Sequence, residues 1–210
     1  MNPATIKIIA TTYSMRKEVK IIFLTIFSIC LIPVIAVIML TQVGLNLVSG
    51  VLASQNPQTL EVDIYDPNTG AIKDHLTEPA IWPTLGPISL EFSESSPYQL
   101  FHTGIDIASP DGKAGTPVAS FMKGKVIYAD TEFWGFGRHV IIDHGHYVTS
   151  IYAHLDTLRV SKGQEVEIGT ILGTRGNTGW STGPHLHFQI TVFTLPVNPR
   201  TFHSGNPEEE

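Results

Sequence analysis

An uncharged apolar run, Ile21–Leu40, constrains this chain more than any other feature. At about 1.5 Å of rise per residue, a helix of this length spans the ~30 Å hydrocarbon core of a bilayer. Three basic residues directly precede the run, and the next Lys or Arg after it is Lys73. Because basic residues favour the cytoplasmic side, we expect a cytoplasmic N-terminus over 1–20, a single-pass transmembrane helix over 21–43, and a C-terminal part outside the cytoplasmic membrane.

A cleaved signal peptide is the competing interpretation of the apolar run. Its cleavage site would be the small-residue stretch Val51, Leu52 and Ala53. The run is longer than the ~7–15 residues usual for the apolar region of a signal peptide, which favours an uncleaved anchor. A buried core helix is disfavoured because the run has no polar face. Both remaining interpretations export the rest of the chain.

Residues 44–80 are predicted to be a connector, either a stalk or an extra strand laid against the following domain. The alternation in 60–65 predicts one short strand, and Asp-Pro-Asn-Thr-Gly at 66–70 is a turn signal. We expect a folded domain over 81–203 and a disordered tail over 204–210.

Residues 81–203 have the pattern of a β protein. Short runs rich in Val, Ile, Tyr and Phe alternate with glycine turns, at 124–129, 139–143, 147–152, 165–168 and 186–192. The stretch 143–146 lies between two such runs and predicts a hairpin turn. The expected fold is therefore mainly β, a compact antiparallel sandwich or barrel.

Charge and cysteine content limit the chemistry of this domain. Residues 1–53 carry four basic and one acidic side chain, net +3, whereas the remainder carries nine basic and eighteen acidic ones, net −9. Binding of nucleic acid needs a basic surface, so no nucleic-acid partner is expected. The single cysteine, Cys30, lies in the apolar run. Any metal in the folded domain must therefore be held by His, Asp or Glu.

Two histidines, His185 and His187, stand one residue apart in a predicted strand. Because side chains in a strand alternate between faces, both imidazoles lie on one face. They form either half of a metal site or a pair of surface histidines.

A second candidate stretch contains His102, Gly104 and Asp106, which share one face of an extended chain. Glycine removes steric bulk between the imidazole and the carboxylate. Imidazole and carboxylate ligands suit Zn²⁺, whereas an all-oxygen site would suggest Mg²⁺ or Ca²⁺. Taken alone, His102 is equally well a surface histidine and Asp106 a turn or cap residue. A third candidate, His154, ends a β run and is either functional or a sheet-edge histidine.

Taken together, the chain from about Trp82 to Pro199 resembles the M23 family of zinc metallopeptidases, the lysostaphin-type and LytM-type cell-wall endopeptidases. The motifs that carry the resemblance are His102-x-Gly104-x-Asp106, Gly115-Thr-Pro-Val118, Gly124-x-Val126, Asp143-His-Gly145, Tyr152-Ala-His154-Leu155, Gly163-Gln-x-Val166, Gly176-Asn-Thr-Gly179, Ser181-Thr-Gly-Pro-His185-Leu-His187-Phe188 and Val197-Asn-Pro199.

The resemblance implies one Zn²⁺ per chain, with His102, Asp106 and His187 as ligands. It also implies that His154 and His185 lie beside the metal as catalytic histidines, either of which is a candidate general base.

The sequence departs from the family pattern at several positions. Gln189 stands where an acid is frequent, and we expect no catalytic consequence. The stretch 92–97 replaces a frequent aromatic-Gly-x-Arg turn, which affects one wall of the groove. We expect three further histidines to be structural or exposed, namely His139, His144 and His146.

The function that the resemblance implies is a membrane-anchored zinc metalloendopeptidase. It would hydrolyse peptide bonds of peptidoglycan, in stem peptides or cross-bridges, outside the cytoplasmic membrane. The alternative is a non-catalytic LytM-type regulator that binds and activates a wall amidase or a division or secretion partner. Expected partners are peptidoglycan peptides, the cytoplasmic membrane through the N-terminal helix, and a component of the cell-envelope machinery.

Overall fold

A computed structural model describes residues 3–203 and 205–208 of the 210-residue chain, with side chains from Lys17 onward. The chain divides into two compact units, Met1–Thr41 and Gln42–Glu210, which are described separately. The side chain of Arg16, one of the basic residues before the apolar run, lies outside the described residues, as do residues 204, 209 and 210 of the predicted tail.

The first unit is helical. Helix α1 extends from Pro3 to Leu52 and has Pro33 in its interior. Among the described residues, the stretch Lys17–Leu52 is long and apolar enough to cross a membrane, with a mean hydropathy of 3.0 in its most apolar window. Large apolar side chains such as Phe23 and Leu40 are exposed. A single apolar N-terminal helix of this kind fits a membrane anchor or a signal sequence.

The last turns of α1 belong to the second unit. The amide of Asn46 donates a hydrogen bond to Ser93 Oγ (2.7 Å), and the backbone N–H of Asn198 donates to Ser49 Oγ (2.8 Å). Leu52 is buried in the core of this unit.

The predicted connector contains a small antiparallel sheet. Its strands are β1 (Ala53–Gln55), β2 (Val62–Tyr65) and β3 (Ile72–Leu76), in the order β1-β2-β3. Only β2 was expected from the sequence. Strand β1 is three residues long and β3 has charged residues in its centre, so neither has an apolar alternation long enough to be recognised.

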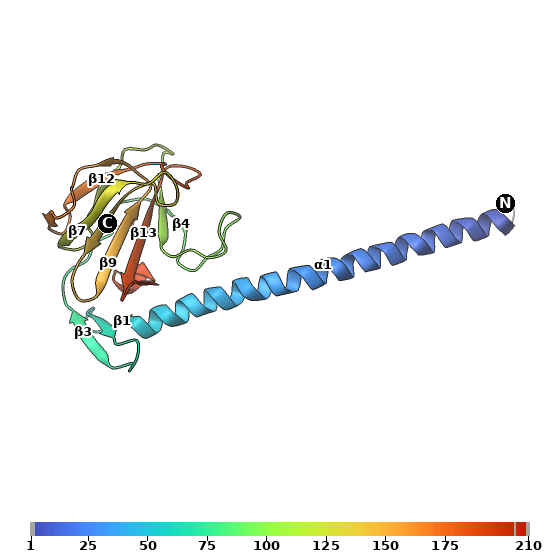
Figure 1. Ribbon diagram of the computed structural model, residues 1–210, viewed down its shortest axis with the longest axis horizontal. Helices are drawn as coiled ribbons and strands as arrows, with labels where there is room; N and C mark the ends of the chain where they lie inside the picture. Colours follow the sequence, from blue (N-terminus) through green and yellow to red (C-terminus); the bar gives the residue numbers. More distant parts are fainter. Residues whose placement is uncertain (1–2, 204, 209–210) are drawn as a thin grey trace. The chain divides into compact units, whose positions relative to one another are not determined.

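The rest of the second unit is built from two antiparallel sheets (Figure 1). Among the described residues the larger has eight strands, in the order β11-β7-β8-β9-β13-β5-β4, with β14 paired to β13. The smaller has the order β10-β12-β6. The strand bounds are β4 Ile88–Leu90, β5 Ile105–Ala108, β6 Pro117–Ala119, β7 Gly124–Thr131, β8 Arg138–Asp143, β9 Val148–Ala153, β10 Leu155–Leu158, β11 Glu165–Val166, β12 Ile171–Arg175, β13 His185–Val192 and β14 Leu195–Val197, followed by the 3₁₀ turn η1 Pro199–Thr201.

The predicted mainly β fold is therefore confirmed. Five predicted strands correspond to β7, β8, β9, β11 and β13, and residues 144–147 form the expected turn between β8 and β9.

Strand β13 lies near the middle of the large sheet, between β9 and β5. From Leu186 to Val192 it is buried along its whole length, as expected for a strand covered on both faces. The ring of Phe188 packs 5.4 Å from Phe121 and 5.5 Å from Tyr152, measured between centroids. A strand so firmly packed is a rigid support for the two histidines at its start.

The C-terminal residues 205–208 have defined contacts, although the sequence assigns them to a disordered tail. Pro207 is buried, and its carbonyl accepts a hydrogen bond from the backbone N–H of Gly86 (3.4 Å). Arg200 pairs with Glu91 (2.7 Å) and donates a hydrogen bond to the carbonyl of Gly205 (2.9 Å). Such contacts cannot be inferred from a local sequence of polar residues and proline.

Candidate metal centre and active site

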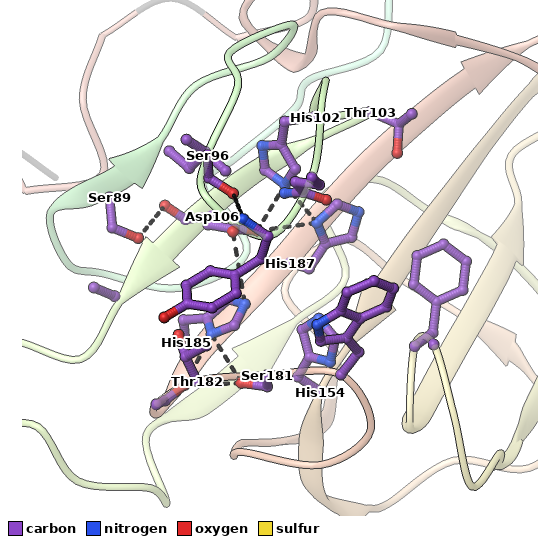
Figure 2. A pocket seen from close by; sticks show the side chains of 18 of the residues that line it. Ser89, Ser96, His102, Thr103, Asp106, His154, Ser181, Thr182, His185 and His187 are labelled. Carbon is purple, nitrogen blue, oxygen red and sulfur yellow. Dashed lines mark hydrogen bonds and ion pairs between the residues drawn. The ribbon is translucent and has the colours of Figure 1, made fainter. Parts of the chain in front are cut away.

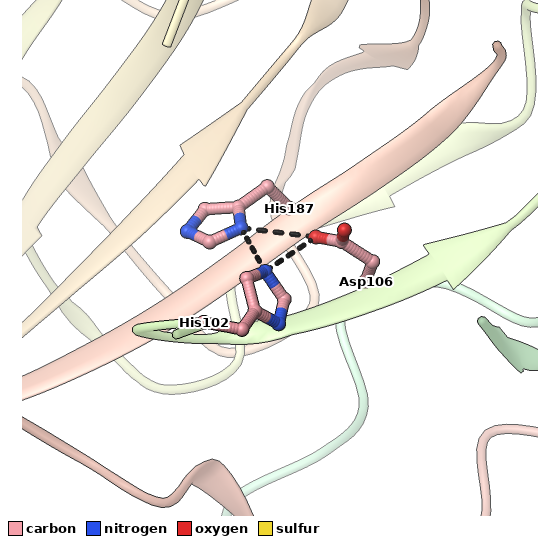
Figure 3. A group of neighbouring side chains, drawn as sticks. All are labelled: His102, Asp106 and His187. Carbon is pink, nitrogen blue, oxygen red and sulfur yellow. Dashed lines mark hydrogen bonds and ion pairs between the residues drawn. The ribbon is translucent and has the colours of Figure 1, made fainter. Parts of the chain in front are cut away.

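Three side chains from two strands and one loop converge at the large sheet (Figure 3). Asp106 on β5 and His187 on β13 are register partners, and His102 precedes β5 by three residues. His102 Nε2 lies 2.8 Å from His187 Nδ1 and 2.9 Å from Asp106 Oδ1. His187 Nδ1 lies 2.9 Å from the same carboxylate oxygen. The three residues that the sequence proposes as metal ligands are thus in mutual contact.

Gly104 makes this convergence sterically feasible. A Cβ added there would lie 2.5 Å from the backbone oxygen of Phe188 and 2.9 Å from Cε1 of His187. Any larger residue would therefore push the imidazole of His187 or strand β13 away.

Each of the two imidazoles has a hydrogen-bond acceptor next to its outward nitrogen. His102 Nδ1 lies 3.1 Å from the backbone carbonyl of Glu91, which can only accept a hydrogen bond. His187 Nε2 lies 3.4 Å from Gln189 Oε1, an oxygen that also accepts the hydroxyl of Thr103 at 2.7 Å. In the tautomer with the hydrogen on the outward nitrogen, each ring offers the lone pair of its inward nitrogen to a metal beside Asp106 Oδ1.

Two imidazole nitrogens and a carboxylate oxygen this close together favour a positive charge between them, either a proton or a metal ion. A proton is disfavoured, because burial lowers the pKa of His187. Burial by itself would raise the pKa of Asp106, but interactions with His102 and His187 outweigh it and hold that pKa well below its usual range. Asp106 is therefore a carboxylate at neutral pH. Two imidazole nitrogens and one carboxylate oxygen form a donor set that fits Zn²⁺.

His154 lies beside this cluster at the end of β9. Its backbone is in the left-handed region (φ 62°), a conformation that a non-glycine residue adopts only when its surroundings hold it there. Its N–H donates to the carbonyl of Phe136 (2.9 Å), and its Nδ1 donates to the carbonyl of Thr178 (2.8 Å). Nε2 is left with the lone pair. Burial, followed by the neighbouring imidazoles, lowers the pKa of His154 to about 4, so the ring is neutral at pH 7.

His185 faces His154, with 4.7 Å between the ring centroids. Its Nδ1 donates to the carbonyl of Gly183 (2.8 Å), with Ser181 Oγ close by at 3.2 Å. Its Nε2 lies 3.7 Å from Asp106 Oδ2. Two imidazoles, each with its Nδ1 hydrogen held by a carbonyl, are therefore placed next to the candidate metal site (Figure 2).

All five residues line one pocket of about 760 Å³. Other parts of its wall come from the stretch 96–99, which begins inside the region 92–97 where the sequence departs from the family pattern, and from Phe136, Trp180 and Ser181.

Three other histidines of the domain lie outside this cluster. His139 is buried and stacks on Tyr128, with 4.4 Å between ring centroids. His144 donates to the carbonyl of Lys123 and contacts Ser150 Oγ, both at 2.7 Å, and burial lowers its pKa to about 4. His146 pairs with Asp74 on β3 (2.9 Å). Each has a structural environment, in line with the expectation from the sequence.

Sequence reasoning missed two residues that support the cluster, Gln189 and Thr103. The sequence analysis assigned no consequence to Gln189, yet its amide oxygen faces His187 and binds the hydroxyl of Thr103. A signal was available, since Gln189 lies two residues beyond His187 and therefore on the same face of the strand. The contact from Thr103 could not be read from strand periodicity, because Thr103 lies in the loop before β5.

The fold and the site together define a class of protein. It is a mainly β domain with a His-Asp-His cluster on two neighbouring strands of its large sheet and the loop before one of them, and with two further histidines in the same pocket. Comparison with known proteins identifies the family. Residues 100–199 match the model of peptidase family M23. The chain belongs to this family.

Two curated relatives illustrate its range. The chain is 39% identical over 107 residues to the DD-carboxypeptidase/endopeptidase Mpg of Neisseria meningitidis serogroup B, covering 51% of this chain and 24% of that protein. It is 38% identical over 118 residues to the murein hydrolase activator NlpD of Escherichia coli K12, covering 56% of this chain and 29% of that one. The chain thus spans less than a third of the length of each of these relatives.

Solved structures agree with this assignment. The catalytic domain of the prophage-encoded M23 protein EnpA from Enterococcus faecalis aligns over 98% of its length and 61% of this chain, with 32% identity and a TM-score of 0.51. A zinc-containing peptidase from Vibrio cholerae aligns over 47% of its length and 74% of this chain, with 30% identity and a TM-score of 0.53.

Proposed function

We propose that this chain is a membrane-anchored zinc metalloendopeptidase that hydrolyses peptide bonds of peptidoglycan outside the cytoplasmic membrane. The observation that carries the proposal is the convergence of His102 Nε2, His187 Nδ1 and Asp106 Oδ1 within 2.9 Å of one another.

The proposed ligands are His102, Asp106 and His187, and the proposed cofactor is one Zn²⁺. When bound, zinc acts as a Lewis acid toward a carbonyl and lowers the pKa of water from about 15.7 toward ~7. Glu91 and Gln189 hold the two ligand imidazoles in the tautomer that coordination needs.

His154 and His185 are the proposed catalytic residues. At neutral pH the Nε2 of His154 is an unprotonated acceptor that can take a proton from the attacking water. Once an imidazole is protonated, it can stabilise the oxyanion of the tetrahedral intermediate and donate its proton to the leaving amine. The two rings are close enough to serve both steps around one scissile bond, since their centroids are 4.7 Å apart.

Peptidoglycan as substrate is supported by the relatives, one of which is named as a DD-carboxypeptidase/endopeptidase and another as a murein hydrolase activator. The apolar helix supports attachment to the membrane, with the acidic second unit on the outer side.

The test uses the full-length chain in detergent micelles. Zinc would be quantified by mass spectrometry, and soluble peptides released from purified peptidoglycan would be measured before chelation, after chelation and after zinc is restored. We expect about one zinc per chain. The release of soluble peptides should stop when zinc is removed and resume when zinc is restored. A folded chain that binds zinc but releases nothing from any wall preparation would refute the proposed hydrolysis.

A second candidate function is a non-catalytic regulator, favoured by the 38% identity to NlpD. Such a protein would increase the release of stem peptides by a wall amidase while cleaving nothing itself. Measuring amidase activity with and without the full-length chain separates the two functions. The regulator predicts that His154→Ala leaves the stimulation unchanged.

A further inference from the structure

Three exposed aromatic side chains stand side by side at the edge of the pocket. Phe133 is 96% exposed, Trp134 70% and Trp180 58%. The rings of Phe133 and Trp134 are stacked with centroids 6.3 Å apart, and those of Trp134 and Trp180 with centroids 6.0 Å apart. We call Phe133, Trp134 and Trp180 the aromatic ridge. Neighbouring large aromatic side chains that are exposed to solvent are typical of a binding surface.

The two loops that carry the ridge are joined by hydrogen bonds. The backbone N–H of Trp180 donates to the carbonyl of Gly135 (2.8 Å), and that of Arg138 donates to Thr178 Oγ1 (3.0 Å). The loops approach so closely that a Cβ on Gly137 would lie 2.5 Å from the backbone of Thr178. The stack is therefore pre-organised, which lowers the entropy cost of binding.

The same loops hold the candidate catalytic histidine. His154 donates its backbone N–H to the carbonyl of Phe136 and its Nδ1–H to the carbonyl of Thr178. Trp180, Gly135 and Glu132 also line the pocket that contains the His-Asp-His cluster. A substrate bound at the cluster and extending past His154 would therefore reach the ridge.

The local charge restricts what this surface can bind. Segment 130–138 carries two acidic side chains, Asp130 and Glu132, and one basic side chain, Arg138, and residues 54–210 have a net charge of −9. Nucleic acid and anionic lipid need basic side chains. A neutral ligand with flat, weakly positive C–H faces is suited to the negative faces of the aromatic rings. N-acetylated pyranose rings have this chemistry.

We infer that the aromatic ridge is a carbohydrate subsite that binds N-acetylated sugar rings of the glycan strand. This inference rests on the proposed peptidoglycan hydrolysis and deepens it: the preferred substrate is a peptide still attached to its glycan. The sugar stacks on Trp134 and Trp180 while the peptide lies along the pocket toward His154.

Binding is tested first without metal or turnover. The full-length chain, in a detergent that contains no sugar, would be titrated with a β-1,4-linked pentamer of N-acetylglucosamine by calorimetry. We expect saturable binding, weakened about three- to tenfold in Trp134→Ala and in Trp180→Ala, the range of an aromatic stacking contact. The matched control is Tyr147→Ala, because Tyr147 is an exposed aromatic residue stacked on Phe193 and outside the pocket lining. Its affinity should equal that of the unmodified protein.

Cleavage is tested second. Trp134→Ala should lower kcat/KM for stem peptides attached to glycan and leave the value for the same free peptides unchanged.

The inference is overturned if the unmodified chain does not bind the pentamer, or if both tryptophan variants bind it equally well. A second result would also overturn the inference. If brominated lipid in reconstituted bilayers quenches the fluorescence of Trp134 and Trp180, and the sugar pentamer does not change that fluorescence, the aromatic ridge binds lipid. Because binding is measured without turnover, peptidase activity can fail while the subsite stands. Equal cleavage of free and glycan-attached peptides by every variant would leave the peptidase intact and remove the subsite.

Discussion

Asp106 and His187 are direct register partners on the antiparallel strands β5 and β13, and Asp106 Oδ1 lies 2.9 Å from His187 Nδ1. The two side chains are 81 residues apart in the sequence. Their distance is set by the spacing between neighbouring strands rather than by a flexible loop. Strand pairing therefore positions two of the three candidate ligands, while His102 is held by the loop before β5.

Asp106→Asn should remove the negative charge from the cluster while keeping its shape. Because the carboxylate is the anionic member of the proposed donor set, zinc affinity should fall more than about 100-fold. Such a loss exceeds the range typical for residues that only hydrogen-bond to a metal ligand. Competition with a chelator measures this affinity, and the melting temperature of the metal-free protein checks the fold. Unchanged zinc binding would exclude Asp106 as a ligand.

Gln189→Leu should weaken zinc binding about 10–100-fold, because the hydrogen bond that orients His187 is lost. Gln189→Glu, which keeps an acceptor, should retain the affinity. Thr191→Val is the matched control, since Thr191 lies two residues further along β13 and pairs with Thr149 away from the cluster. Equal affinities in the Leu and Val variants would show that Gln189 does not orient the ligand.

The His154→Ala variant should still bind zinc, but its cleavage rate should be lower by a factor of about 10²–10⁴. This factor is the usual contribution of a positioned general acid or base. Single-turnover release of peptide and the zinc content of the same sample measure the two effects. Loss of zinc together with rate would mean that His154 holds the metal. A rate equal to that of the unmodified protein would remove it from catalysis.

Gly104→Ala should destabilise the domain by about 1–3 kcal/mol, the cost of forcing an extra methyl group into a packed site. The added carbon would meet the backbone of β13 and the ring of His187. Gly183→Ala is the control, because a Cβ there has nothing within 4 Å. Chemical denaturation of the metal-free proteins gives both values, and similar values for the two variants would contradict the predicted clash.

The stability of the domain should fall as the solution is acidified below pH 6.5. Burial lowers the pKa of His144 to about 4, so between pH 4 and 6.5 the unfolded chain binds a proton that the folded protein does not. The free energy of unfolding therefore decreases as pH falls through this window, by on the order of 3 kcal/mol, and is fully regained above it.

The measurement for this prediction is denaturation in urea at several pH values, compared with His144→Gln. The pKa of His154 is also lowered, so His154 changes the pH dependence of stability equally in both proteins. The difference between the two plots of unfolding free energy against pH therefore gives the contribution of His144. Parallel curves would mean that the protonation of His144 does not affect stability.

Several elements were predictable because their signals are local. The apolar run, the alternation in β7 to β9 and the turn after Asp143 each depend on residues close together in the chain. The strands β1 and β3 were missed because they are short or carry charged residues, and pairing with β2 stabilises them. Tertiary contacts, rather than local propensity, determine whether such segments become strands.

By itself, the sequence determined the mainly β class, the apolar N-terminal helix and the residue types that meet at the candidate site. These features are predictable because strand periodicity and short motifs depend only on residues close together in the chain. Only the tertiary structure decided which atoms face one another: Glu91 and Gln189 place acceptors at the outward nitrogens of His102 and His187, and Trp134 and Trp180 stack beside the loop that holds His154. The physical reason is register. A contact between strands far apart in the sequence depends on how the whole sheet pairs, and no local pattern contains that information.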